Sequence, residues 1–128
     1  MEIVKTIILL LSGLMLLFVG LMRLTNPIKT YLKSSGIKLS NNVDLLNEVR
    51  GVSAVMFCAG IIILLGILIP KMSLTSFTVG TLIFSGFALG RVVSLLIDGK
   101  PNKQIMQGIM FEIVLGGANL FGIFSVLA

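Results

Sequence analysis

Four long apolar runs determine what this chain can fold into. A helix needs about 20 consecutive apolar residues to cross the hydrocarbon core of a bilayer. The runs lie at roughly Ile3 to Met22, Val49 to Ile69, Leu74 to Ile97 and Ile105 to Leu127. Since 56% of the 128 residues are hydrophobic and only 12% are charged, little chain is left for a soluble domain. We expect one all-α domain over residues 1–128, a polytopic four-transmembrane-helix bundle of two antiparallel hairpins.

The composition excludes several kinds of site. The chain has one cysteine, Cys58, and no histidine, so it can build neither a CxxC redox pair nor a His-ligated haem or zinc site. We expect no cofactor and no metal. A net charge of +5 could suggest nucleic acid, but the basic residues are spread along loops with no aromatic residues between them. The expected partner is the lipid bilayer and not nucleic acid.

The basic residues are divided unevenly between the two sides of the predicted bundle. The first and third loops carry Arg23, Lys29, Lys33, Lys38, Lys100 and Lys103, whereas Lys5 and Lys71 lie on the other side. Because cytoplasmic loops are enriched in lysine and arginine, this distribution predicts a multi-pass protein of the cytoplasmic membrane with both termini outside. Lys5, close to the first residue, opposes that orientation.

The loops contain two recognisable local structures. Asn26 before Pro27 is typical of a helix start and Gly36 of a helix end, so we expect a short helix over about 27–36. This segment either lies in the membrane interface or is an ordinary connector. Residues 98–102 read Asp-Gly-Lys-Pro-Asn, which predicts a tight turn and an antiparallel hairpin of the last two helices.

A weak internal repeat supports the plan of two hairpins. Each half has an arginine late in its first helix, a proline in its loop and a glutamate early in its second helix, namely Arg23 and Arg91, Pro27 and Pro101, Glu48 and Glu112. Parallel repeats of this kind would place a shared site between the halves.

Small residues recur every fourth position on the last two runs. Gly86, Gly90 and Ser94 lie on the third run, and Ala118 and Gly122 lie on the fourth. Helices in lipid pack through such residues because no hydrophobic effect drives them together. We favour contacts within one subunit, and a homodimer or a membrane-protein partner is the alternative.

Five ionisable residues lie inside or at the mouths of the apolar runs, all in the same half of the bilayer. They are Glu48, Arg50, Arg91, Asp98 and Glu112. Such charges are usually paired inside the bundle and mark a functional site by default. A helix rises about 1.5 Å per residue, so Arg91 lies roughly 10 Å deeper in the membrane than Asp98. Glu112 lies roughly 13 Å deep from the same side, which places the two residues at similar depth. We therefore expect Arg91 and Glu112 to pair, with Glu48 and Arg50 completing a buried network.

Two more polar residues belong to the predicted site. Ser94 shares a helix face with Arg91 and Asp98. Asn119 lies on a small and polar stripe with Glu112, which should face the bundle interior. The network either fixes helix register only or lines a cavity that binds an anionic head group, a small polar solute or a proton.

Two strings resemble a known family. Glu48 to Gly51 matches a Glu-x-Arg pattern, and Gly90 to Pro101 matches a Gly-Arg-x-x-Ser-x-x-x-Asp-Gly-x-Pro block. A glutamate in the last helix completes the pattern and is matched by Glu112. The chain therefore resembles the bacterial domain-of-unknown-function family numbered 4345, whose members are small four-helix integral membrane proteins. The resemblance covers nearly the whole chain and implies a fold and a bacterial inner membrane, but no reaction. A more distant likeness to DoxX-like proteins is an analogy of fold only.

The sequence favours one functional class over two others. A non-enzymatic binding or accessory protein ranks first. A small-solute or proton-coupled transporter that uses Glu112 and Arg91 ranks second. A membrane-embedded redox or lipid enzyme ranks third, because the chain lacks a histidine base that could activate Ser94.

Overall fold

The computed structural model describes residues 1–128, and all of its regular elements are helical. In chain order they are α1 (Glu2–Thr25), α2 (Pro27–Ser35), α3 (Val43–Leu68), the 3-10 turn η1 (Pro70–Met72), α4 (Ser73–Ile97) and α5 (Lys103–Leu127). The helices α1, α3 and α5, and α4 together with η1, are long and apolar enough to cross a membrane. The predicted all-α, multi-pass fold is confirmed.

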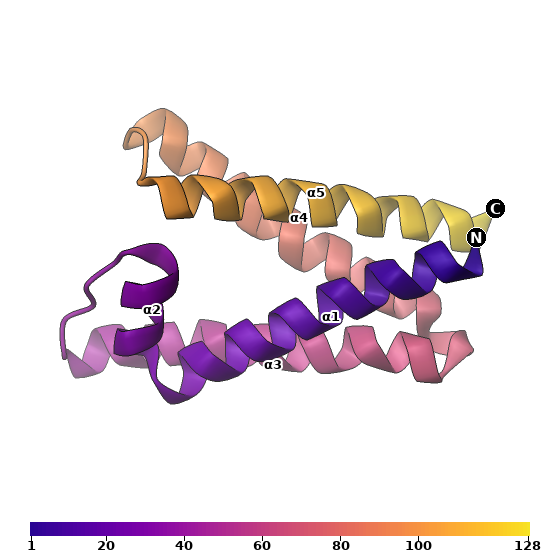
Figure 1. Cartoon of the computed structure of the whole chain (residues 1–128), viewed down its shortest axis with the longest axis horizontal. Coiled ribbons are helices and arrows are strands. Elements are labelled where there is room, and N and C mark those ends of the chain that lie inside the picture. Colours follow the sequence, from indigo (N-terminus) through magenta and orange to yellow (C-terminus); the bar gives the residue numbers. More distant parts are fainter.

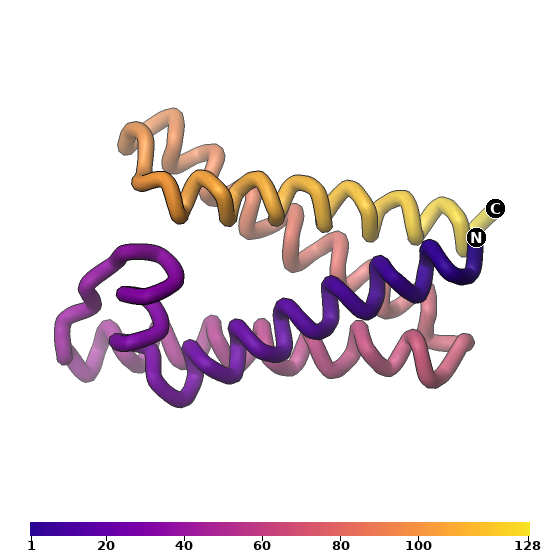
Figure 2. Tube along the Cα trace, in the orientation of Figure 1, coloured from indigo at the N-terminus to yellow at the C-terminus, as the bar shows by residue number.

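The four long helices form two hairpins. α1 packs along α3, and α4 packs along α5 (Figure 1). The hairpins converge where both chain termini lie, and their traces diverge toward the opposite end, which we call the α2 end (Figure 2). α3 also contacts α4 but does not contact α5. The α2 end holds α2 and the 98–102 turn, so both helix-connecting loops rich in lysine lie there.

A side-chain cap sets the start of α3. The side-chain oxygen of Asn42 accepts hydrogen bonds from the backbone amides of Asp44 and Leu45, at 2.9 and 3.2 Å. These amides have no partner inside the helix, and a capping asparagine satisfies them. The helix therefore begins at Val43, whereas the apolar run predicted a span from Val49. The helix therefore extends about six residues beyond the apolar run at its N-terminal end.

The short helix predicted in the first loop is present as α2. Pro27 occupies its first position, where the missing amide proton costs nothing. Gly36 ends it with a φ of 68°, in the left-handed region that favours glycine.

Glycines bring α1 and α3 into close contact. A Cβ atom added at Gly20 would lie 2.6 Å from the backbone nitrogen of Phe57, and one at Gly60 would lie 2.6 Å from that of Leu17. Backbone atoms cannot move aside as a flexible side chain can. This hairpin therefore depends on glycine at the contact, as expected for helices that associate in lipid.

The small residues predicted to pack within the subunit behave differently from one another. A Cβ at Gly122 would meet the ring of the buried Phe77, so Gly122 packs inside the bundle as predicted. A Cβ at Gly86 or Gly90 would meet nothing within 4 Å, and Ser94 is exposed. The prediction of packing within the subunit is wrong for these three, because α4 turns its Phe77 and Phe84 face toward the other helices.

Two buried hydrogen bonds join the hairpins. Asn119 Nδ2 on α5 donates to Ser12 Oγ on α1 at 2.9 Å, and Ser76 Oγ on α4 donates to the carbonyl of Ile62 on α3 at 2.8 Å. Ser12, Ser76 and Asn119 are fully buried. The rest of the core is filled by apolar side chains, so these two hydrogen bonds set the position of one hairpin relative to the other.

The contact between α1 and α3 makes a testable prediction for stability. Gly60→Ala should lower the free energy of unfolding by about 1–3 kcal/mol, the usual cost of an overpacked contact. The measurement is the midpoint of heat-induced loss of the monodisperse peak on size-exclusion chromatography in detergent.

The matched control is Gly86→Ala, which adds the same methyl group where no atom lies within 4 Å. It should leave the midpoint unchanged or raise it. Equal midpoints for the two variants would contradict a close contact at Gly60.

Candidate functional site

An ion pair joins the two helices of the second hairpin. Arg91 Nε lies 2.8 Å from Glu112 Oε1, and their side chains are 32% and 14% exposed. The predicted pair is therefore present. Glu112 Oε1 is buried and its close polar partner is the Arg91 guanidinium. A carboxylate has about four acceptor sites, so this pair leaves Glu112 able to accept further hydrogen bonds.

The predicted network of four charges is not formed. Glu48 is exposed and takes part in no ion pair. Arg50 is also exposed, and its Nη1 donates to the backbone carbonyl of Leu24 at the end of α1. The physical reason is the divergence of the hairpins: both residues lie in the first turns of α3, which does not contact α5. The structure contains no buried cluster of charges.

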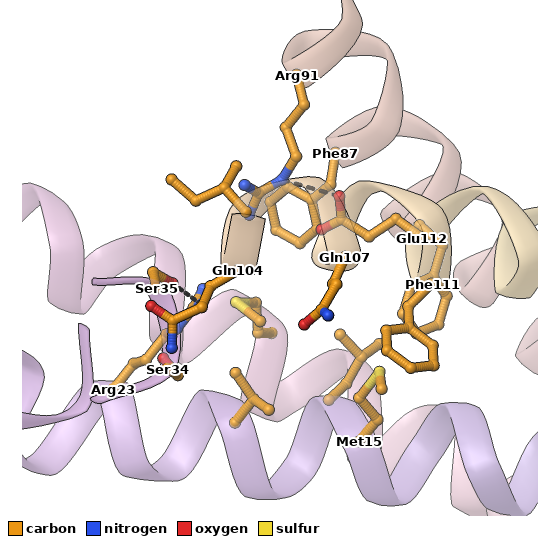
Figure 3. Close-up of a pocket in the computed structure, with 16 residues that line it drawn as sticks. Met15, Arg23, Ser34, Ser35, Phe87, Arg91, Gln104, Gln107, Phe111 and Glu112 are labelled. Carbon is orange, nitrogen blue, oxygen red and sulfur yellow. Dashed lines mark hydrogen bonds and ion pairs between the residues drawn. The ribbon is translucent and has the colours of Figure 1, made fainter. Parts of the chain in front are cut away.

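The polar residues at the end of α4 interact with one another and not with the ion pair. Ser94 Oγ donates to Asp98 Oδ2 at 2.8 Å, and both residues are exposed. Sequence spacing placed them on one face with Arg91, but the long arginine side chain reaches toward α5 instead (Figure 3).

Asn119 faces the bundle interior as predicted but does not join the charged pair. Besides its bond to Ser12, Asn119 Nδ2 donates to the carbonyl of Leu115 at 2.8 Å. Its Oδ1 has no partner and approaches Gly80, where an added Cβ would clash with it. Asn119 therefore links the hairpins beyond Glu112, on the side of the chain termini.

A pocket of about 320 Å³ lies between the hairpins at the α2 end. Every helix except the 3-10 turn contributes to it. The lining residues are Met15, Leu16, Val19 and Arg23 of α1, Ser34 and Ser35 of α2, Met56 of α3, Phe84, Phe87 and Arg91 of α4, and Gln104, Ile105, Gln107, Gly108, Phe111 and Glu112 of α5. A volume near 300 Å³ is at the lower end of small-molecule pockets.

Arg23 is the most important pocket residue that the site prediction missed. Its guanidinium carbon lies 4.4 Å from the centroid of the Tyr31 ring, and its Nη2 donates to Ser35 Oγ at 3.4 Å. Its Nε is buried and no protein atom accepts a hydrogen bond from it. Arg23 ends the first apolar run, and this position indicates a loop residue at the membrane surface. Its correspondence to Arg91 in the internal repeat was the signal that could have found it.

Two amide side chains fasten α2 over the pocket. Asn102 Nδ2 donates to the carbonyl of Ser35 at 2.8 Å, and Gln104 Nε2 donates to that of Lys33 at 3.1 Å. Because α2 folds back in this way, Ser34 and Ser35 join the pocket wall near Arg23 and Gln104 (Figure 3). No sequence pattern predicted this contact, which joins residues more than sixty positions apart.

The charges of the pocket do not balance. Arg23 and Arg91 contribute two positive charges and Glu112 one negative charge, so one positive charge remains uncompensated. An arginine in a partly apolar pocket is suited to carboxylate or phosphate, which it can bind through two parallel hydrogen bonds. No three His, Cys, Asp or Glu side chains lie together in a way that could hold a metal ion.

Four helices that are long and apolar enough to cross a membrane, paired as two hairpins with a charged pocket between them, indicate a small multi-pass membrane protein. The chain belongs to the family described as Domain of unknown function (DUF4345), which matches residues 4–123. No curated protein and no solved structure matches the chain. Because the family description names no activity, function has to be argued from the pocket.

The ion pair makes a second testable prediction. Arg91→Ala should lower the free energy of unfolding by about 1–3 kcal/mol. This loss lies between the small cost of breaking an exposed ion pair and the larger cost of breaking a buried one. The charge-swapped double variant Arg91→Glu with Glu112→Arg should recover part of that loss. The measurement is the heat-inactivation midpoint in detergent.

Lys100→Ala is the control, since Lys100 is exposed and takes part in no ion pair. A midpoint for Arg91→Ala no lower than that for Lys100→Ala would show that the pair contributes nothing to stability.

Proposed function

We propose that this protein is a non-enzymatic binding or accessory protein of the bacterial cytoplasmic membrane, which holds an anionic ligand in the pocket between its hairpins. One observation carries the proposal: Arg23, Arg91 and Glu112 come from three different helices and line the same pocket, with one positive charge in excess. A charge network that served only to fix helix register would not need a second arginine without an acidic partner.

The distribution of basic residues supports an orientation with the α2 end toward the cytoplasm. Both loops that carry most of the lysines lie at that end (Figure 1). By the positive-inside rule, the pocket then lies in the inner half of the bilayer and both termini lie outside.

Contacts beyond the pocket support binding over transport. A carrier has to open its site toward both sides of the membrane in turn. Here the bond between Asn119 and Ser12, and the packing of Phe77 on Gly122, fill the bundle between the pocket and the end that holds the termini. These buried contacts favour a site with access from the α2 end only.

The hydroxyl groups of the pocket support a role without catalysis. Ser34 Oγ donates to the carbonyl of Thr30, and Ser35 Oγ accepts from Arg23. Neither serine is paired with a general base that could activate it as a nucleophile.

Native mass spectrometry tests the proposal. Wild-type protein, gently extracted from its own membrane, should carry a bound anionic molecule that Arg23→Gln loses, because this substitution removes the only positive charge of the pocket that no acidic side chain neutralises. Arg50→Gln, which makes the same change outside the pocket, should retain the molecule. Wild-type protein without any anionic adduct would contradict the proposed function, and proton-dependent solute flux in proteoliposomes that Glu112→Gln abolishes would favour the carrier.

The orientation is tested by labelling single cysteines with a membrane-impermeant maleimide. In a Cys58→Ala background, Lys71→Cys should react in intact cells, whereas Lys38→Cys should react only after the cells are opened. Both positions are exposed in the fold. The reverse pattern would place the pocket in the outer half of the bilayer.

A further inference from the structure

We infer that the ligand is a singly charged anionic amphiphile, whose anionic group binds at Arg23 and whose apolar chain runs between α1, α4 and α5 toward Met15 and Phe84. This inference rests on the proposed function, because it names the ligand class of the same pocket. The shared chemistry is one oxyanion on an apolar chain, and its source is either a single-chain acid or the head group of a membrane phospholipid.

The hydrogen-bonding state of Arg23 identifies the position of the anion. Arg23 forms no ion pair, since the two acids that do so are Glu2, with Lys5, and Glu112, with Arg91. Its protein contacts are the Tyr31 ring and one long hydrogen bond to Ser35, and its Nε has no acceptor. A buried donor on a charged group requires an acceptor, and an oxyanion in the pocket supplies one.

The α1 and α4 walls of the pocket change from polar to apolar along its length, whereas the α5 wall also carries Gln107 and Glu112. Near α2 its wall consists of Arg23, Ser34, Ser35 and Gln104. Met15 lies eight residues before Arg23 on α1, which is roughly 12 Å deeper at the rise of a helix. Phe84 lies seven residues before Arg91, roughly 10 Å deeper on α4. A ligand that satisfies both regions is polar at one end and apolar at the other.

The apolar walls suit a flexible chain. The apolar side chains that line the pocket come from four helices and include Met15, Met56, Phe84, Phe87 and Phe111. Methionine side chains have no branches and adapt to irregular shapes, so they can follow a chain of variable conformation. At about 320 Å³ the pocket accommodates a head group and the first part of one chain.

Glu112 sets the charge of the ligand. Its carboxylate already neutralises Arg91, which leaves one positive charge for the ligand. A dianion would bring a second negative charge near Glu112 in a poorly screened site, and this repulsion discriminates against it. Glu112 is therefore a specificity-determining residue.

The test is titration of the full-length protein in phosphatidylcholine nanodiscs at pH 8, read by native mass spectrometry. The probes are dodecanoate, dodecyl phosphate, dodecanol and acetate. Dodecanoate should bind at a ratio of one to one, at least about tenfold more tightly than dodecanol or acetate, as expected for a hydrogen-bonded charge pair plus a buried chain. This comparison uses the wild-type protein and needs no substitution.

Substitutions locate the anion and test selectivity. Arg23→Gln should weaken dodecanoate binding about tenfold, to the level of dodecanol, whereas Arg50→Gln should change nothing. Arg23→Lys, which keeps the charge, should retain the preference for dodecanoate. Glu112→Gln should shift the preference about tenfold toward dodecyl phosphate, which is mainly dianionic at this pH.

The outcomes separate this inference from the proposed function. Acetate that binds as tightly as dodecanoate would overturn the amphiphile and leave an anion-binding protein. Dodecanol that binds as tightly as dodecanoate would overturn both the inference and the proposed function. If none of the probes binds but the extracted protein still carries an anionic adduct, only the inference is overturned. Phosphatidylglycerol that displaces dodecanoate would identify a phospholipid as the source, and failure to displace it would identify a single-chain acid; either result supports the inference.

Discussion

Close contact between α1 and α3 is the constraint on which the remainder of the fold depends. Lipid chains are as apolar as leucine, so helices do not associate in a bilayer merely by hiding apolar surface. At Gly20 and Gly60 the two backbones meet where no side chain fits. This contact gives the first hairpin a defined shape, against which α4 and α5 pack through Phe77 and the bond between Asn119 and Ser12.

The pocket exists because the second hairpin leaves the first at an angle. Close to the chain termini, small residues and buried hydrogen bonds hold the hairpins together. Toward α2 the interface is formed instead by long side chains, which include Arg23, Arg91 and Glu112. Charged groups are costly to bury between tightly packed helices, but they can line a polar opening near the membrane surface. The hairpins therefore diverge at the same end of the bundle that carries the charged side chains, because charged groups are too costly to bury where helices pack tightly.

The sequence predicted the fold more completely than the site. Apolar runs of membrane-crossing length and the 98–102 turn sufficed for the four helices and their pairing, since both are local signals. The pair of Arg91 and Glu112 followed from equal depth on adjacent helices. Helical rise gives depth but not the direction a side chain faces, so Glu48 and Arg50 were wrongly added to the network. Arg23 was missed because its place in the pocket depends on α2 folding back onto α5.

The order of synthesis gives the last helix a particular importance. The first hairpin can form its glycine contact before α4 and α5 have been made, because domains and their parts fold from the N-terminus as the chain emerges. α5 supplies more of the sixteen pocket residues than any other helix, together with the only carboxylate among them. Until α5 is inserted, Arg91 has no counter-charge and α2 has neither of its two amide partners. The pocket is therefore assembled later than the glycine contact of the first hairpin, since it cannot form before α5 has been inserted.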